Sequence, residues 1–165
     1  MGLNLKVNSA VLIPRPETEE LVDWILRNNK NKQYRIIDIG TGSGCIPLAL
    51  KTSMKSSQLF AVDISESALK VAKQNADLNN LEIQFFQADI LKWENYSWDS
   101  FDIIVSNPPY VRELEKKEMH KNVLSFEPEN ALFVSNEDPL LFYRQIAEFA
   151  LEYLVDRGQL YFEIN

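Results

Sequence analysis

Cysteine and histidine are almost absent from this sequence. Among 165 residues there is one cysteine, Cys45, and one histidine, His120. A disulfide within the chain needs two cysteines, and a structural zinc site is built from about four Cys and His ligands. The sequence therefore excludes an intramolecular disulfide and a Cys/His metal cluster, and it argues against Ser-His catalysis.

Long apolar runs and an excess of positive charge are also missing. No stretch approaches the ~18 uncharged apolar residues of a membrane-spanning helix, and the N-terminus lacks the charged-then-apolar layout of a signal peptide. Acidic residues outnumber basic ones, 24 against 17, which gives a formal net charge of −7. The missing apolar run and signal peptide favour a cytoplasmic protein with no membrane partner. Because Lys and Arg supply the affinity for phosphate backbones, we also expect no direct nucleic-acid partner. A local basic patch remains an alternative.

The composition is that of a folded domain. Hydrophobic residues make up 45% of the chain and charged residues 25%, which is ordinary for a soluble globular protein. The sequence contains no internal repeat, low-complexity tract or linker. Residues 1–165 are therefore expected to form a single domain.

Short apolar segments alternate along the chain with amphipathic ones, which predict strands and helices respectively. The expected strands cover residues 34–39, 59–63, 83–86, 101–106 and 159–164, and residues 3–13 suggest a short hairpin or a lead-in strand. The expected helices run over residues 21–29, from 45, from a cap at Ser65, and from a cap at Asp138 to 157–158. This order predicts an α/β fold, with a Rossmann-like, doubly wound, mainly parallel sheet and helices on both faces.

The tetrapeptide Asn107-Pro108-Pro109-Tyr110 follows the apolar strand expected over residues 101–106. The prolines fix an extended backbone and offer no N–H, so the loop presents two acceptors, the Asn107 side-chain oxygen and the Pro108 carbonyl, beside the aromatic ring of Tyr110. Two acceptors suit the planar NH2 of an amide or an exocyclic amine. A rigid turn after a strand is the alternative.

A glycine-rich turn, Gly40-Thr41-Gly42-Ser43-Gly44, joins the first sheet strand to a helix. Pro47 is tolerated only in the first turn of that helix, which places the helix N-terminus directly after the glycines. Glycines allow a ligand to approach the backbone, and the helix N-terminus favours an anionic group such as a carboxylate. The lysine of a P-loop and the spacing of a dinucleotide motif are missing.

Two further strands end in an acid. Asp63 lies 19 residues after Gly44, close to the ~20-residue spacing at which nucleoside-binding folds place a ribose-binding carboxylate. Asp89 follows the third strand and could accept a hydrogen bond from an adenine amine. Both could instead be helix or turn caps.

Two segments carry no assigned role. Arg15, Glu17 and Thr18 lie in a proline-rich and acidic stretch before the first helix. The polar segment over residues 112–137 has no clear period and could be a lid or a solvated connection.

With these motifs, the chain resembles class I S-adenosylmethionine-dependent methyltransferases, and more narrowly the HemK/PrmC family, which methylates the glutamine amide of peptide chain release factors. Asp38 to Gly44 and Asp63 carry the resemblance to the class. The narrower resemblance rests on Ile13-Pro-Arg-Pro-Glu-Thr-Glu19, on Ser106 before Asn107-Pro-Pro-Tyr110, and on Glu127-Pro128 with Ala131-Leu132.

The resemblance implies a role for each matching residue. Gly40, Thr41, Gly42, Ser43 and Gly44 would line the methionine end of S-adenosylmethionine, Asp63 would bind its ribose, and Asp89 with Ile90 would flank its adenine. Asn107, Pro108, Pro109 and Tyr110 would hold the glutamine amide for direct transfer, with Asn107 also beside the cofactor. The family has an N-terminal substrate-recognition domain and a final antiparallel hairpin, and neither is expected within this chain.

Two other functions compete with this hypothesis. An adenine-N6 or related nucleic-acid methyltransferase would use the same loop for an exocyclic amine, although the acidic balance counts against it. An inactive cofactor-binding module is the second alternative.

Overall fold

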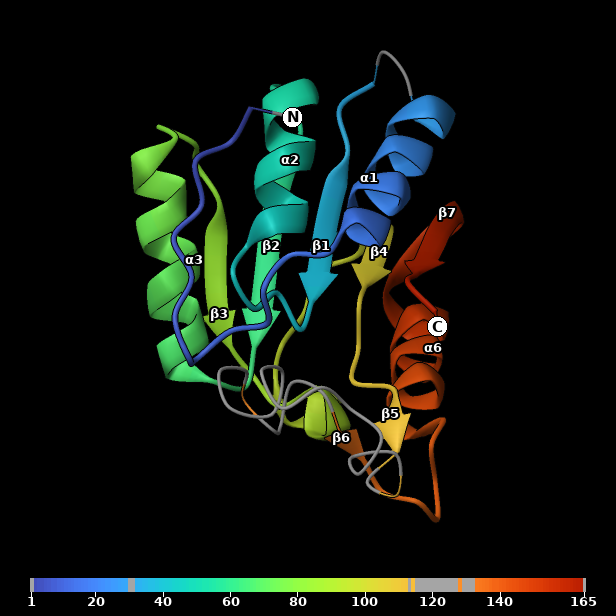
Figure 1. Cartoon of the computed structure of the whole chain (residues 1–165). Helices are drawn as coiled ribbons and strands as arrows, with labels where there is room; N and C mark the ends of the chain where they lie inside the picture. Colours follow the sequence, from blue (N-terminus) through green and yellow to red (C-terminus); the bar gives the residue numbers. More distant parts are fainter. Residues whose placement is uncertain (1, 30–31, 113, 115–127, 129–132, 165) are drawn as a thin grey trace.

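A five-stranded sheet forms the centre of the computed structural model (Figure 1), which describes all residues except 1, 30–31, 113, 115–127, 129–132 and 165. Its strands are β1 (Arg35–Ile39), β2 (Gln58–Asp63), β3 (Gln84–Gln87), β4 (Phe101–Ser106) and β7 (Leu154–Phe162). They lie in the order β3-β2-β1-β4-β7, and each neighbouring pair is parallel. All five carboxyl ends therefore point to the same edge of the sheet.

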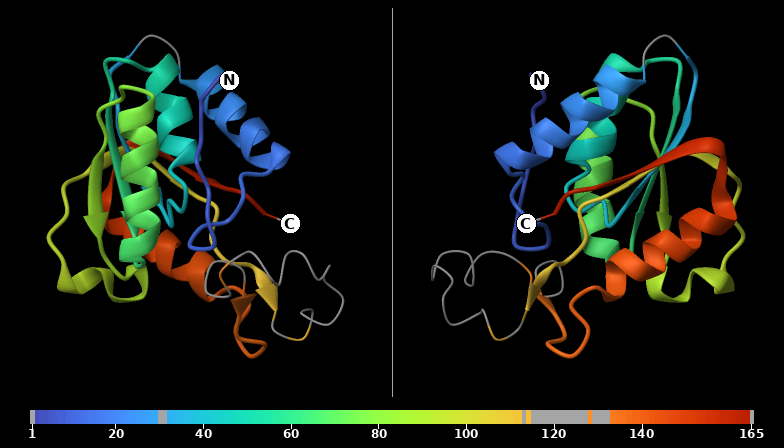
Figure 2. Two further views of the ribbon diagram at one scale, coloured as in Figure 1. Left: turned by 60° about the vertical axis from the view of Figure 1, so that its left-hand side comes forward. Right: turned by 90° about the vertical axis from the view of Figure 1, so that its right-hand side faces the viewer.

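Apolar side chains cover both faces of the central strands. Ile36 and Ile103 pack with α1 (Pro16–Asn28) and α2 (Cys45–Ser53), whereas Ile37 and Ile104 pack with α6 (Leu141–Tyr153) and the 3₁₀ helix η1 (Ile90–Asn95). Strands buried on both faces read as continuous apolar runs, which explains why the sequence predicted them. Figure 2 shows the sheet between these two layers, and the predicted doubly wound α/β architecture is confirmed.

Local sequence sets the helix starts. Ser65 caps α3 (Glu66–Leu78), since its hydroxyl oxygen accepts a hydrogen bond from Ala68 N at 3.2 Å, as predicted. The first helix starts earlier than the expected Leu21, because Pro16 occupies its first turn and presets the backbone angle. Thr18 is consequently part of α1 and is buried.

The predicted hairpin or lead-in strand over residues 3–13 is wrong. This N-terminal segment, residues 2–15, is irregular and runs alongside α3 (Figure 1). Its backbone pairs with side chains instead of a strand: Asn4 N–H donates to Asn79 Oδ1 at 3.1 Å, and Lys6 N–H donates to Asn75 Oδ1 at 2.7 Å. Asn75 Nδ2 in turn donates to the carbonyls of Lys6 and Ser43, both at 2.9 Å.

The boundaries of the last helix and strand also differ from the prediction. Helix α6 begins at Leu141 rather than at Pro139, because residues 138–140 form a turn in which Leu141 N–H donates to the Asp138 carbonyl. It ends at Tyr153 rather than near Arg157-Gly158. Leu154 pairs with Phe101 of β4, and an irregularity in the ladder places Gln159 opposite Ile103. Strand pairing thus takes over residues that the helical spacing assigned to α6.

A second, two-stranded parallel sheet joins β5 (Val111–Arg112) to β6 (Phe133–Val134) beyond the carboxyl edge of the main sheet. Most of the polar segment over residues 112–137, for which a lid or a solvated connection was considered, lies outside the described residues.

In the part of the chain that the structure describes, no helix is long and apolar enough to cross a membrane. The same described residues contain no group of His, Cys, Asp and Glu that could hold a metal ion.

Replacing Asn75 with alanine is expected to destabilise the fold by about 2–4 kcal/mol. The side chain is fully buried and satisfies backbone groups of both the N-terminal segment and the glycine turn, so its loss leaves three of them unpaired. Urea unfolding measures the effect. Asn79→Ala, which also releases the N-terminal segment but has no bond to the glycine turn, is the matched control. Equal losses in the two variants would show that the bond to Ser43 contributes nothing.

Candidate active site

A cavity of about 290 Å³ opens at the carboxyl edge of the main sheet. This volume lies just below the range of about 300–1,000 Å³ for small-molecule sites. It is surrounded by the N-terminal segment, the glycine turn, the residues at the ends of β1, β2, β3 and β4, and the first turns of several helices, among them α1, α2 and α6. Its walls include the predicted site residues Gly40, Thr41, Gly42, Ser43, Asp63, Asp89, Ile90, Asn107, Pro108 and Pro109. Two predicted residues, Gly44 and Tyr110, are not part of its lining.

The glycine turn is held in place by the neighbouring strand. The N–H groups of Gly40 and Thr41 donate to the Val62 carbonyl at 2.8 and 3.0 Å. Gly44 forms the N-cap of α2 with φ of 79°, and a Cβ there would lie 3.1 Å from the Ala72 Cβ on α3. The glycine at this position is thus required both by the left-handed backbone and by the close approach of α3. Its role is to shape the turn rather than to line the cavity.

Asp63 ties the end of β2 to the glycine turn. Its Oδ2 accepts from Gly42 N–H and its Oδ1 from Ser65 N–H, both at 2.9 Å. Burial raises the pKa of Asp63 above its ordinary value, and the bonds from Ser65 and Gly42 act in the opposite direction. A carboxylate offers about four acceptor positions, so Asp63 can still accept hydrogen bonds from a molecule in the cavity.

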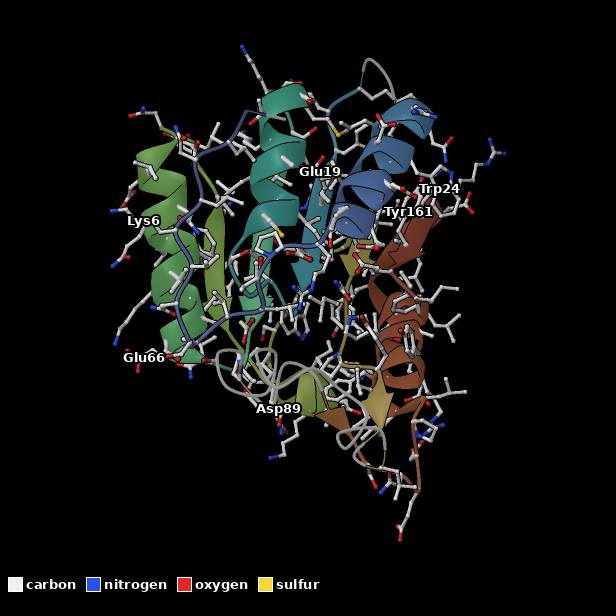
Figure 3. All side chains as sticks on the ribbon, in the orientation of Figure 1. Lys6, Glu19, Trp24, Glu66, Asp89 and Tyr161 are labelled. Atoms are coloured by element: carbon white, nitrogen blue, oxygen red, sulfur yellow. The ribbon has the colours of Figure 1, made fainter. Side chains whose placement is uncertain are left out.

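Asp89 both caps η1 and lines the cavity. Its Oδ1 accepts from Leu91 N–H at 3.0 Å and caps η1, and its Oδ2 lies 3.5 Å from Lys92 Nζ. The residue also lines the cavity, close to η1 at the lower end of the sheet in Figure 3. Capping and lining are compatible because the carboxylate retains further acceptor positions.

The Asn107 loop is anchored directly before its first residue. Ser106 is fully buried, and its hydroxyl donates to the Ile39 carbonyl at 2.6 Å, which joins the end of β4 to the end of β1. Asn107, Pro108 and Pro109 then follow along the cavity wall. Tyr110 lies outside the wall, near Tyr143 of α6, where its charge contributes to a raised pKa of Tyr143.

Two polar residues at this edge were not among the predicted site residues. Glu163 follows β7, and the side chains of Thr18 and Asn107 lie close enough to its carboxylate to lower its pKa, while its Oε2 is buried without a hydrogen-bond partner among the described residues. Thr18 itself lines the cavity. Glu163 carries the same sequence signal as Asp63, an acid directly after an apolar strand, so that signal could have identified it.

Asp38 and Thr41 form a buried polar pair beneath the cavity wall. Within the part of the chain that the structure describes, neither Asp38 oxygen nor the Thr41 hydroxyl has a hydrogen-bond partner. Burial raises the pKa of Asp38 to about 7, the Thr41 hydroxyl beside it lowers that pKa, and the charge of Asp63 raises it. Asp38 therefore takes up a proton far more readily than an exposed aspartate does.

Comparison with known proteins identifies the family. The Methyltransferase small domain family matches residues 18–132, which is more than half of the chain and includes the glycine turn, Asp63, Asp89 and Asn107. The chain belongs to the methyltransferase small domain family.

Relatives of this methyltransferase domain have a more specific name. The Release factor glutamine methyltransferase of Flavobacterium psychrophilum is 55% identical over 168 residues, which cover 99% of this chain and 59% of that protein. The protein of the same name from Bacteroides thetaiotaomicron is 51% identical over 164 residues, with the same coverage of 99% and 59%. The resemblance inferred from the motifs is confirmed, and the chain spans about three fifths of the length of these relatives.

A solved structure supports the fold of this methyltransferase domain. A methyltransferase from Pyrococcus furiosus superposes with a TM-score of 0.65 over 96% of this chain and 68% of that chain, at 17% identity. At this identity the likeness concerns the fold alone. It confirms the predicted Rossmann-like class.

The cavity fits the cofactor that a methyltransferase of this type implies, S-adenosylmethionine. Thr41 belongs to the lining, and its buried hydroxyl has no hydrogen-bond partner among the described residues, which leaves a donor and acceptor at the cavity wall for the polar end of a bound molecule. Asp63 has free acceptor positions for hydroxyl groups, and Ile90 and Ile146 add apolar wall. These features match a molecule with a polar amino-acid end, a ribose and a planar base.

Proposed function

We propose that this chain binds S-adenosylmethionine in the cavity and methylates the side-chain amide nitrogen of a glutamine in a peptide chain release factor. One observation carries the proposal: Asn107, Pro108 and Pro109 lie on the wall of the same cavity as the glycine turn and Asp63. A planar amide held by the Asn107 loop would therefore lie beside a cofactor held by the turn. The names of the relatives support the choice of substrate.

The roles of the residues follow from their positions. Gly40, Thr41, Gly42 and Ser43 would hold the methionine end of the cofactor, Asp63 its ribose, and Asp89 with Ile90 its adenine. When bound, S-adenosylmethionine supplies a methyl group that passes to the amide nitrogen, while the sulfur keeps the bonding electrons and one N–H proton leaves to water.

Asn107 and its loop would perform the orientation on which the reaction depends. An amide nitrogen is a weak nucleophile because its lone pair is delocalised. The Asn107 side-chain oxygen and the Pro108 carbonyl would accept the two amide hydrogens, polarise the N–H bonds and hold the nitrogen against the methyl group. Holding two reactants in this way supplies a large part of a rate enhancement, up to roughly 7–11 kcal/mol in favourable cases.

The partner and location belong to the same proposal. A release factor is a protein that acts in translation, so we place this chain in the cytoplasm. No membrane and no direct nucleic-acid partner are part of the proposal, in keeping with the formal net charge of −7.

Methyl transfer from labelled S-adenosylmethionine to a release factor tests the function. We expect label on a wild-type release factor that carries no methyl group beforehand, and none on a release factor whose acceptor glutamine is replaced by alanine. Label on DNA or RNA but not on protein would instead establish the nucleic-acid methyltransferase. Cofactor binding by calorimetry with no transfer to protein, DNA or RNA would establish a binding module.

A further inference from the structure

The backbone of Glu163 is held by hydrogen bonds on both its N–H and its carbonyl. Its backbone N–H donates to the Ser106 carbonyl at 3.0 Å, and its carbonyl accepts from the Tyr143 hydroxyl at 3.1 Å. Only 9% of the residue is exposed. The backbone of Glu163 is therefore held between β4 and α6, directly beside the residue that precedes Asn107.

The side chain of Glu163 meets Asn107 and Thr18. Both side chains lower the pKa of Glu163, as hydrogen-bond donors beside a carboxylate do, and the buried Oε2 of Glu163 has no hydrogen-bond partner among the described residues. A carboxylate only accepts hydrogen bonds, so a bond from Asn107 would come from its Nδ2 and a bond from Thr18 from its hydroxyl. Such a bond would set which way the Asn107 carboxamide faces. With Nδ2 turned toward Glu163, its Oδ1 is left to accept a hydrogen bond from another group.

We propose that Glu163 is a positioning residue, which holds the Asn107 carboxamide with its oxygen directed at the substrate amide, and that Thr18 of α1 fixes Glu163. The inference rests on the proposed function for its catalytic consequence. An asparagine without such a partner presents its NH2 or its oxygen at little difference in energy, and the NH2 would repel the N–H groups of an amide. Glu163 removes this ambiguity.

The charge state of Glu163 decides whether the arrangement holds. Burial raises its pKa, the Thr18 hydroxyl beside it lowers it, nearby Glu17 of α1 raises it, and the Asn107 side chain lowers it. Cys45 of α2 and Tyr143 of α6 also face this group, since its charge raises the pKa of each. When pH falls below the pKa of Glu163, the protonated acid becomes a donor and the carboxamide loses its fixed orientation.

Nuclear magnetic resonance of the side-chain NH2 of Asn107 tests the orientation without catalysis. The 165-residue chain is labelled with nitrogen-15, and the signal pair of Asn107 is assigned by its absence in Asn107→Asp. We expect this pair to shift as Glu163 titrates, and we expect the shift to vanish in Glu163→Gln. Glu152→Gln, on the exposed face of α6, is the matched control and should leave the titration intact. An Asn107 pair that titrates unchanged in Glu163→Gln would overturn the proposal.

Kinetics test the consequence for transfer. We expect Glu163→Gln to lower kcat roughly 10- to 100-fold while the Kd for S-adenosylmethionine stays within about twofold, and Glu163→Asp to recover part of the loss. An unchanged kcat in Glu163→Gln would overturn the proposal. If the wild-type chain transfers no methyl group, the proposed function fails, and the resonance experiment alone decides whether Glu163 positions Asn107.

Discussion

Replacing Asn107 with alanine is expected to lower the rate of methyl transfer by roughly 100- to 1,000-fold, the loss typical of removing one preorganised hydrogen-bonding group from an active site. The variant lacks the side-chain acceptor that faces the substrate amide. The Ser106 anchor and the two prolines keep the loop in place, so the loss should appear in kcat. The Kd for S-adenosylmethionine, measured by calorimetry, should change far less, because the glycine turn and Asp63 are intact.

A distant asparagine provides the control for this variant. Asn28 lies at the far end of α1, is exposed, and makes one long contact of 3.4 Å with the Tyr161 hydroxyl. Asn28→Ala should transfer methyl groups at the wild-type rate. If Asn107→Ala weakened cofactor binding as much as it slowed transfer, the residue would bind the cofactor and the proposal that it orients the amide would be lost.

The sequence predicted the cavity because its residues follow a simple rule. Gly40, Asp63, Asp89 and Asn107 each lie at the end of a strand or just beyond it, and the carboxyl ends of parallel strands meet at one edge. No knowledge of side-chain contacts was needed. The strand order β3-β2-β1-β4-β7 was not predicted, since it depends on how the crossovers pack.

Contacts between distant segments could not be predicted in this way. The N-terminal segment alternates like a strand, but Asn75 and Asn79 of α3 satisfy its backbone, and a spacing rule does not contain that pairing. Leu154 fits the helical spacing of α6 and yet pairs with β4. In both cases tertiary partners override a local pattern.

Thr18 was not predicted as a site residue because the start of the first helix was placed five residues too late. With a helix starting at Leu21, Thr18 lies before the helix and has no assigned role. Once Pro16 starts α1, Thr18 lies in the first turn, is buried, and lies beside the Glu163 carboxylate, whose pKa it lowers. The proline-rich stretch before α1 therefore positions one wall of the cavity.

Asp38→Asn is expected to change how stability depends on pH by as much as a few kcal/mol. Burial raises the pKa of Asp38 from 3.8 to about 7, so the folded chain keeps this proton over a range in which the unfolded chain has released it. Below about pH 4 both states are protonated. Between about pH 4 and 7 the free energy of unfolding of the wild type should fall as pH rises, because folding then requires uptake of a proton. The asparagine variant lacks this contribution.

Urea unfolding of both proteins between pH 4 and 8 measures the effect as a difference, which removes the contributions that they share, such as the raised pKa values of Asp63 and Glu163. The stability of Asp38→Asn relative to wild type should increase steadily up to about pH 7 and then level off. Asp77→Asn, on the exposed side of α3, should show no such trend. A difference between Asp38→Asn and wild type that is constant over this range would mean that Asp38 is ionised in the folded protein. The buried carboxylate would then need a cationic or hydrogen-bonding partner beneath the glycine turn.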